Sequence, residues 1–389
     1  MSVNTFSGMP RGGIASRTGW STAADPEQAV RELREQLDQS EPFATMFFVS
    51  SHYDLDRIAR EVNLQFEGPV TGCTSAGGLC SAGFVDHGIV GASIPLRHMS
   101  LEPHLIRNIN EFNGEQAREL AERITANPMQ QSGRMLGLLL VDGLSMREEI
   151  TLANLQHALP EVPIFGGSAG DNMEFRRTFV YHDGRFHTNA AVLAILRTDL
   201  RFRLFKIQHF EPTEARLVIT EAIPETRTVI SINGYPAAEE YARLVGVSVE
   251  QLSTELYSSH PMLMRVGGEY YVRSIMKANP DGSLMFACAI DNGLVMRIGR
   301  GVGLVESLDS ELARLRAEMP GLELIFGCDC AFRRLEALQK GLQDGVREVL
   351  GRYNFIGFNT YGEQINHLHV NQTLTGIALG GADGYAGRD

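Results

Sequence analysis

Three short loops rich in glycine recur along this 389-residue chain, and each follows a segment predicted to be a buried strand. They are Gly72-Cys-Thr-Ser-Ala-Gly77, Gly166-Gly-Ser-Ala-Gly-Asp171 and Gly357-Phe-Asn-Thr-Tyr-Gly-Glu363. Open α/β sheets bind ligands in loops at the carboxyl ends of their strands, and glycine lets backbone approach a ligand closely. The loops therefore predict a ligand pocket, with the alternative that each glycine only makes a tight turn. The expected pocket residues are Gly72, Ser75, Gly77, Gly166, Ser168, Gly170, Gly357 and Gly362.

Polar side chains at the ends of these loops are candidates for orienting a ligand. Asp171 and Asn172 follow the second loop, and Glu363 ends the third, with Asn371 shortly after it. Asp171 and Glu363 share a place just after the last glycine of a repeated loop. The alternative for both carboxylates is that they accept hydrogen bonds from exposed backbone N–H groups of the loop.

One loop also contains a motif of serine hydrolases. Gly166-Gly-Ser-Ala-Gly170 matches the G-x-S-x-G pattern, which requires a helix directly after the serine. Here the chain runs into a predicted strand at Thr178-Phe-Val-Tyr181 instead, and no phosphate-binding lysine follows any glycine loop. No nucleophile, base and orienting group can be assembled, so we expect a binding protein rather than an enzyme.

The five cysteines are sparse and odd in number. Cys328-x-Cys330 lies at a predicted strand end, but Cys73, Cys80 and Cys288 do not supply the two further ligands that a structural zinc site needs. Buried inert thiols are the simplest interpretation, and Cys328 is retained as a pocket candidate because it ends a strand of the third repeat. Free thiols favour the reducing cytoplasm.

Composition narrows the class of partner. Hydrophobic residues make up 43% of the chain, and 35 basic against 47 acidic residues give a net charge of −12. This acidic balance argues against nucleic acid or an anionic membrane as the main partner. No apolar run approaches the roughly 18 residues of a membrane span, and the start of the chain shows no signal peptide, so we expect a cytoplasmic protein without membrane insertion. Glycine is in excess, with 40 residues, or about a tenth of the chain where about 7% is usual.

The elements that would position the loops follow a repeated order of strand, helix, strand and glycine loop. Hairpin dipeptides such as Asp183-Gly184 and Asn233-Gly234 separate the repeats. Helices alternating with strands, together with hairpins, predict a mixed α/β fold with mixed sheets flanked by helices. The pattern favours two related domains with a boundary near residues 224–227.

The same loops resemble those of a known family. Gly72-Cys-Thr-Ser-Ala-Gly77 and Pro163-Ile-Phe-Gly-Gly-Ser-Ala-Gly-Asp171 resemble the N-terminal half of FIST-domain proteins. Ile232-Asn-Gly-Tyr-Pro-Ala237, Phe326-Gly-Cys328 and Gly357-Phe-Asn-Thr-Tyr-Gly-Glu363 with Asn371 resemble the C-terminal half. The resemblance covers about residues 17–380 and implies an N-terminal domain at 1–226, a C-terminal domain at 227–381 and a flexible tail at 382–389. Many relatives have an acidic residue where this chain has Gly78, which implies a different ligand.

The resemblance implies a sensory ligand-binding protein of bacterial signal transduction. Stand-alone members are similar to haem proteins that sense nitric oxide and regulate a partner histidine kinase. For this chain it implies non-covalent haem b, since no Cys-x-x-Cys-His is present. His260 is the expected iron ligand, with Met262 and Met264 against the ring and Arg273 on a propionate.

Other assignments stay open at this stage. His182, His187 and the pair His367 and His369 are weaker candidates for the iron ligand. The first rival function is a non-haem sensor of a small, amino-acid-like metabolite, and the second is an interaction adaptor without a ligand. The ligand is thus a small molecule or a gas, and the sequence leaves a homo-oligomer open.

Overall fold

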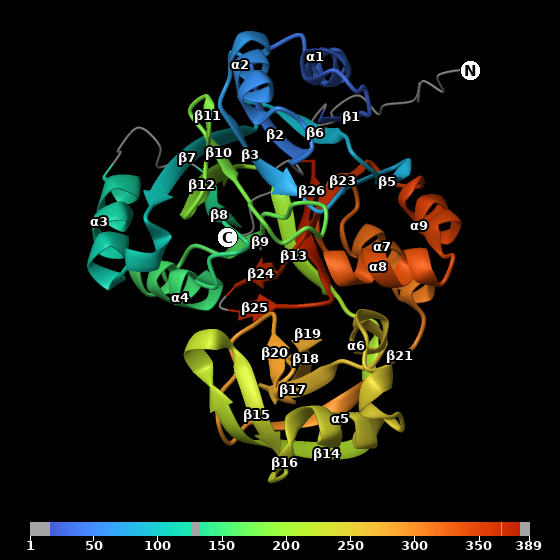
Figure 1. Ribbon diagram of the computed structural model, residues 1–389. Helices are drawn as coiled ribbons and strands as arrows, with labels where there is room; N and C mark the ends of the chain where they lie inside the picture. Colours follow the sequence, from blue (N-terminus) through green and yellow to red (C-terminus); the bar gives the residue numbers. More distant parts are fainter. Residues whose placement is uncertain (1–15, 127–132, 367, 382–389) are drawn as a thin grey trace, which may run out of the picture.

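The computed structural model describes residues 16–126, 133–366 and 368–381. The chain folds into a body of three six-stranded sheets and a smaller domain built on one eight-stranded sheet (Figure 1). The predicted mixed α/β class, with mixed sheets flanked by helices, is confirmed. The predicted tail at 382–389 and the candidate His367 lie outside the described residues.

The three sheets of the body share one plan. In spatial order, the first contains β1 (Arg17–Ser21), β6 (Ile89–Pro95), β2 (Phe43–Ser50), β3 (Val70–Ser75), β10 (Val180–His182) and β11 (Arg185–His187). The second contains β7 (Met99–Arg107), β12 (Ala190–Thr198), β8 (Arg134–Val141), β9 (Ile164–Ser168), β24 (Glu363–Ile365) and β25 (Leu368–Val370). The third contains β13 (Arg201–Ile207), β26 (Leu374–Gly380), β22 (Leu322–Cys330), β23 (Phe355–Thr360), β4 (Gly78–Cys80) and β5 (Gly83–Val85).

Each sheet is centred on two parallel strands joined by a helical crossover, which confirms the predicted strand-helix-strand units. The crossover helices are α2 (Leu55–Gln65), α4 (Glu148–Ala158), and α8 (Ala331–Gln339) with α9 (Gln343–Leu350). A further helix packs beside each crossover, namely α1 (Pro26–Leu37), α3 (Gly114–Thr125) and α7 (Leu304–Glu318). Figure 1 shows the three groups of helices at the top, left and right of the body.

Each sheet is completed by a hairpin that belongs to another repeat. The hairpin β4-β5 follows β3 in the chain but pairs with β23, β10-β11 follows β9 but pairs with β3, and β24-β25 follows β23 but pairs with β9. This exchange brings the three glycine loops, which lie between those strands, to the centre of the body.

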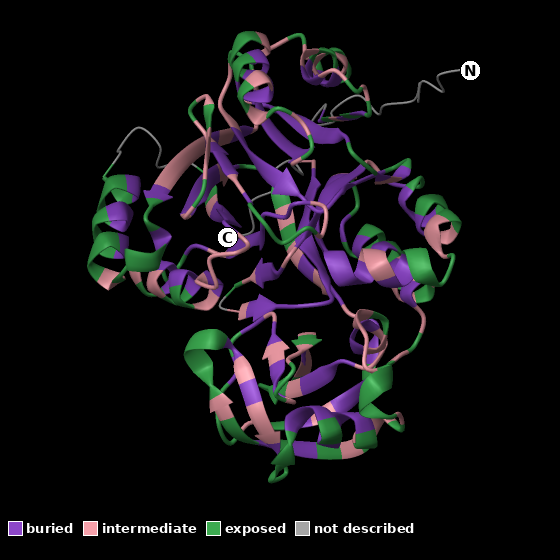
Figure 2. Ribbon diagram, viewed as in Figure 1, coloured by how far each residue is buried: buried purple, intermediate pink, exposed green. Residues whose placement is uncertain are grey.

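Side chains of the central strands point alternately to the two faces of each sheet, which explains why both faces are buried. Phe48 packs inward, where it stacks on Phe358 with ring centroids 4.0 Å apart, in a core shared by all three sheets. Its neighbour Phe47 faces the other side and packs under α1 and α2. Successive residues of a strand point to opposite faces, so each sheet buries one face centrally and one under helices. Figure 2 shows the resulting buried centre with exposed positions on the outer helices.

The smaller domain, residues 210–301, is inserted into the third repeat, and we call it the inserted domain. Its strands are β14 (Phe210–Ile223), β15 (Thr228–Ile232), β16 (Tyr235–Pro236), β17 (Met262–Val266), β18 (Glu269–Arg273), β19 (Ile275–Ala278), β20 (Leu284–Phe286) and β21 (Val295–Gly301). Its helices are α5 (Ala237–Val245) and α6 (Thr254–Ser259), with short 3-10 turns at Pro224–Thr226 and Val249–Gln251. Another 3-10 turn, Ile109–Glu111, precedes α3 in the body.

The sheets divide the chain differently from the predicted boundary between residues 226 and 227. That boundary falls inside the inserted domain, because β14 and β15 pair across it. The third repeat begins earlier, at β13, which pairs with β26 near the end of the chain. The body thus contains three related units, and the fourth sheet stands apart from them. Among the described residues, no helix has both the length and the apolar character needed to cross a bilayer.

Candidate functional site

A cavity of about 680 Å³ lies between the body and the inserted domain, and we call it the large cavity. Its size falls within the usual range of small-molecule sites, roughly 300–1,000 Å³. From the body it is lined by Gly143, Leu144, Met146, Glu148, Met173, Phe175, Cys330, Ala331, Phe332, Leu335, Thr360, Tyr361 and Asn371. From the inserted domain it is lined by Arg227, Thr254, Glu255, Ser274, Met276, Lys277, Met285, Phe286 and Ala287.

Most of this lining is apolar and adaptable. Four methionines contribute, two from the body and two from the inserted domain, namely Met146, Met173, Met276 and Met285. Thioether side chains fill irregular spaces and contact aromatic groups well. Phe175 stacks on Tyr361 with ring centroids 4.6 Å apart and forms part of the body wall. Such a surface suits an organic molecule with an apolar part.

Several loops that carry lining residues have a strained backbone. Met146, Met173, Phe175 and Arg227 have φ angles of 56°, 68°, 54° and 50°, in the left-handed region that disfavours residues with a side chain. Strain of this kind persists where the surrounding structure holds it, and it gathers at ligand sites. Asp142 provides part of that support, because its carboxylate accepts from the N–H groups of Leu144 (3.1 Å) and Asn189 (2.6 Å).

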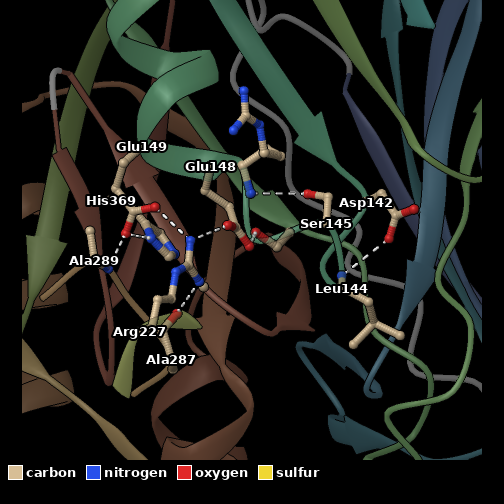
Figure 3. Close-up of polar contacts among 12 residues, drawn as sticks. Asp142, Leu144, Ser145, Glu148, Glu149, Arg227, Ala287, Ala289 and His369 are labelled. Atoms are coloured by element: carbon tan, nitrogen blue, oxygen red, sulfur yellow. Dashed lines mark hydrogen bonds and ion pairs between the residues drawn. The ribbon is translucent and has the colours of Figure 1, made fainter. Parts of the chain in front are cut away.

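A buried ion-pair cluster links the two parts beside the large cavity (Figure 3). The Arg227 guanidinium donates to Glu148 at 2.7 Å, to Glu149 at 2.6 Å and to the Ala287 carbonyl at 2.8 Å. Glu149 also lies 2.8 Å from His369 Nδ1 and accepts from the Ala289 N–H at 2.6 Å. Helix α4 and strand β25 of the body are thereby tied to the inserted domain.

Opposite charges face one another in this cluster. Burial disfavours the ionised form of Glu149, but His369 and Arg227 outweigh it and hold the pKa of this carboxyl below its usual range. Ligand atoms of Glu148, Glu149 and His369 lie within 4.8 Å of one another, a spacing that could hold a metal ion. The Arg227 guanidinium already supplies a cation to both carboxylates, so we interpret the group as an ion-pair cluster.

The structure brings the predicted glycine loops together, but they contact one another. The Ala76 N–H donates to the Asn359 carbonyl and the Asn359 N–H to the Gly77 carbonyl, both at 2.8 Å. Ser168 N–H donates to the Gly362 carbonyl at 2.8 Å, and Gly170 N–H to the Thr74 carbonyl at 3.0 Å. The loops therefore close the centre of the body against one another, while Thr360 and Tyr361 of the third loop also line the large cavity.

The first glycine of each repeat lies within its strand. Gly72, Gly166 and Gly357 face Phe47, Leu139 and Gly327 of the parallel partner strand. A Cβ atom at any of the three would overlap the carbonyl oxygen of that partner residue. Close packing of neighbouring strands explains these glycines, and the lining of the large cavity includes none of the three.

The glycine near the end of each loop, and Gly78 after the first loop, also lie against other parts of the protein. A side chain at Gly170 would collide with Ala76, one at Gly77 with Arg334, and one at Gly362 with the His369 ring. At Gly78 it would meet Val90. The acidic residue expected at that position in relatives therefore has no room in this chain.

The polar candidates divide into two groups. Asn371 lines the large cavity, and Asn172 lines a neighbouring cavity of about 270 Å³. Asp171 instead accepts from the N–H groups of Phe175, Arg176 and Arg177 at 2.6–2.9 Å. This is the capping role that the sequence left open.

Three further candidates are enclosed by protein. Glu363 accepts from the Thr373 N–H at 3.1 Å and hydroxyl at 2.9 Å, which is also a capping role. Ser75 and Ser168 are buried, and the Ser168 hydroxyl accepts from Gln364 at 3.1 Å.

The haem candidates lie elsewhere in the inserted domain. His260 follows α6, and its carbonyl accepts from the Tyr241 hydroxyl at 2.8 Å. Its Nδ1 is buried and has no hydrogen-bond partner among the residues that the structure describes. Met262 belongs to the core of the inserted domain, with Met264 packed against that core. Arg273 is buried and donates to the His369 carbonyl at 3.2 Å. The lining of the large cavity includes none of the four.

Sequence reasoning missed several lining residues. Cys328 is fully buried in the central core, whereas Cys330, two residues further along β22, lines the large cavity. The thiol predicted to line a pocket was Cys328, which the lining of the large cavity does not include. Arg227, Ser274 and the four methionines gave no local signal, because they come from segments that only the fold brings together.

Fold and cavity together define a mixed α/β protein with a binding-sized cavity between a body and an inserted domain. A model of the FIST N domain matches residues 44–235, and one of the FIST C domain matches residues 237–366. The chain therefore belongs to the FIST family, whose domains are sensory ligand-binding modules of signal transduction. The two models meet within residues 235–237, so the inserted domain is shared between them.

Two individual proteins are similar to this chain. An uncharacterized protein of Methanocaldococcus jannaschii is 25% identical over 254 residues, which cover 56% of this chain and 48% of that protein. The chain thus spans about half the length of this curated relative. A crystal structure of chorismatase aligns over 94% of this chain and 98% of its own, with 11% identity and a TM-score of 0.37.

Proposed function

We propose that this protein is a sensor that binds a small organic metabolite in the large cavity. The observation that carries the proposal is that both the body and the inserted domain line this cavity. A ligand that contacts both parts stabilises the arrangement in which they lie together. It can shift a population of domain arrangements only by its different affinity for them.

The ion-pair cluster is a contact that would change if the inserted domain moved relative to the body. Arg227 of the inserted domain reaches both Glu148 and Glu149 of α4, and Glu148 and Arg227 also line the large cavity. A ligand beside these side chains would add to, or compete with, the same contact between the parts. In this proposal the ligand binds beside the contact that holds the inserted domain on the body, so binding directly affects how the two parts are arranged.

A haem with a histidine ligand does not fit the large cavity. None of the described histidines lines it, while gas-binding haem is usually held by an imidazole. His260 lies outside the lining, although its buried Nδ1 without a partner keeps it the best position for the separate haem proposal. An absorption spectrum of protein produced with haem supply tests that proposal, because a colourless protein would rule it out.

We also propose that the sensor binds and regulates a cytoplasmic histidine kinase, whose activity depends on the arrangement of the two parts. The cytoplasm is supported by five cysteines that are all buried and free. The kinase is supported by the resemblance to stand-alone members of the family. The kinase would respond only if it bound the ligand-bound arrangement of body and inserted domain with a different affinity from the ligand-free one.

A thermal-shift screen with a metabolite library tests the main proposal. A ligand of the folded state raises the melting temperature with its concentration. In Met276→Trp, a larger side chain fills part of the large cavity, so the shift should be lost. Val295→Trp places the same side chain at an exposed position of the inserted domain and should keep the shift. A library without any active compound, or a shift that survives Met276→Trp, would contradict the proposal.

A further inference from the structure

The first turn of α8 faces the large cavity and differs from those of the other helices. Among the described α-helices, it is the one that has neither a side-chain cap nor an acidic residue in its first turn. Its first turn instead contains Arg333 and Arg334. Ala331 and Phe332, the first two helical residues, both line the large cavity. Backbone N–H groups at such an end are free to donate, and the helix dipole favours a negative charge there.

A buried hydroxyl of the inserted domain also faces the large cavity without a hydrogen-bond partner among the described residues. Ser274 of the inserted domain lines the large cavity, is only 1% exposed, and its hydroxyl makes no hydrogen bond within the described part of the chain. A buried hydroxyl without a partner is costly and calls for an explanation. Asn371 lies beside it, with its Oδ1 3.4 Å from the Ser274 N–H. A ligand atom that accepts hydrogen bonds would satisfy the Ser274 hydroxyl.

Among the described residues, no acceptor of the protein bonds the Ser274 hydroxyl. Near the first turn of α8, the Cys330 thiol lies close to the Phe332 N–H, but a thiol sulfur is a weak acceptor. The carboxylate of Asp329 is occupied by Arg333 at 2.8 Å, and that of Glu148 by Arg227 at 2.7 Å. These two carboxylates are thus each paired with an arginine.

We propose that the ligand of the large cavity is a carboxylic acid with an apolar body. Its carboxylate accepts from the first-turn N–H groups of α8 and from the Ser274 hydroxyl, which face the cavity from its two sides. Its body packs against Met276, Met285 and Phe286. The inference rests on the proposed function, since it assigns the chemistry of the metabolite that the sensor binds.

Calorimetric titration of the full chain tests the carboxylate. The probes are hexanoate, decanoate and 4-phenylbutyrate, each compared with its primary amide, together with leucine and phenylalanine. Hydrogen bonds to a charged group contribute more than neutral ones, so at least one acid should bind roughly tenfold or more tightly than its amide. Equal affinity of acid and amide, or no binding by any of the acids, would overturn the inference.

Two variants of Ser274 locate the contact. Ser274→Ala removes a hydroxyl without a partner, so the free protein should keep or raise its melting temperature while acid affinity falls roughly tenfold. Ser274→Asp adds a negative charge and should abolish acid binding but spare the amide. Ser310→Ala on the exposed face of α7 is the matched control and should bind like the wild type. Unchanged acid affinity in both Ser274 variants would overturn the inference.

The two proposals can fail separately. If library compounds bind and Met276→Trp abolishes their binding, but carboxylates do not bind, the proposed function stands and the carboxylate is wrong. If only the amino acids bind, a second group besides the carboxylate is required, and the inference is again wrong. If no compound binds, the sensor function itself is contradicted.

Discussion

At the scale of single residues, the carboxylates predicted to orient a ligand instead hold loops together. Asp171 accepts from three backbone N–H groups, and Glu363 accepts twice from Thr373. Both positions follow the last glycine of a repeated loop, where the backbone turns and exposes donors. Glu363 is fully buried, and its Oε1 has no hydrogen-bond partner among the described residues. Its charge is therefore a cost to the folded state.

The pH dependence of stability should reveal this cost. Burial raises the pKa of the Glu363 carboxyl well above its ordinary value of 4.5, against the hydrogen bonds from Thr373 that lower it. The folded state then holds a proton that the unfolded state releases, so the free energy of unfolding should fall as pH rises from about 4.5 through the folded-state pKa. In Glu363→Gln that decline should disappear, and the variant should be the more stable protein at the upper end of this range.

Chemical denaturation across that pH range measures this effect. Glu348→Gln, at an exposed glutamate of α9, is the control and should follow the wild type. A Glu363→Gln protein that is less stable than the wild type at every pH would show that the ionised carboxylate stabilises the fold.

At single residues, the sequence indicates a structural role where the signal is local. Asn371 was predicted and lines the large cavity, and the capping alternative for Asp171 and Glu363 follows from their place after a glycine loop. The four methionines, Arg227 and Ser274 could not be predicted, because nothing in their own segments distinguishes them from core or surface residues. Only the packing of the inserted domain on the body brings them together.

At the scale of elements, the three strand-helix-strand units are predictable, since apolar runs and helical spacing are local properties. The exchange of hairpins is not, because it pairs β4 with β23 and β10 with β3, which lie far apart in the sequence. That exchange explains part of the glycine excess by close packing of the backbone, whereas the sequence had suggested a binding site. Glycines allow three loops and three pairs of parallel strands to approach closely at the centre of the body.

Substitution of these glycines should therefore affect stability. Gly72→Ala places a methyl group against the Phe47 carbonyl, and overpacking of this kind costs about 1–3 kcal/mol or more. Gly114→Ala, at the open start of α3, should leave the free energy of unfolding unchanged or raise it by up to about 1 kcal/mol. Urea unfolding compares the two variants. Equal stability of Gly72→Ala and the wild type would show that the central strands can move apart without cost.

At the scale of the whole molecule, the chain is a body with a domain inserted into its third repeat. The Val302 N–H donates to the His209 carbonyl at 2.9 Å, so the chain leaves the body and returns at one place. A boundary derived from sequence order cannot detect such an insertion, because the third repeat is interrupted between β13 and α7. The large cavity arises at the contact between these two parts.

The ion-pair cluster should be a main contact across that interface. Arg227→Met leaves Glu148 and Glu149 without their cation, and breaking a buried ion pair from one side costs about 3–5 kcal/mol. Arg300→Met, which removes an exposed arginine 3.7 Å from Glu211, should cost at most about 1 kcal/mol. Denaturation with guanidinium chloride measures both losses. Similar losses in the two variants would contradict a stabilising role for the cluster.

Hydrogen–deuterium exchange with and without the most active compound tests the central claim most directly, because it locates binding along the chain. We expect this compound to slow exchange in residues 143–148 and 331–335 of the body and, at the same concentrations, in residues 274–287 of the inserted domain. Protection confined to one of the two parts, or centred on residues 260–264, would contradict a ligand held between them.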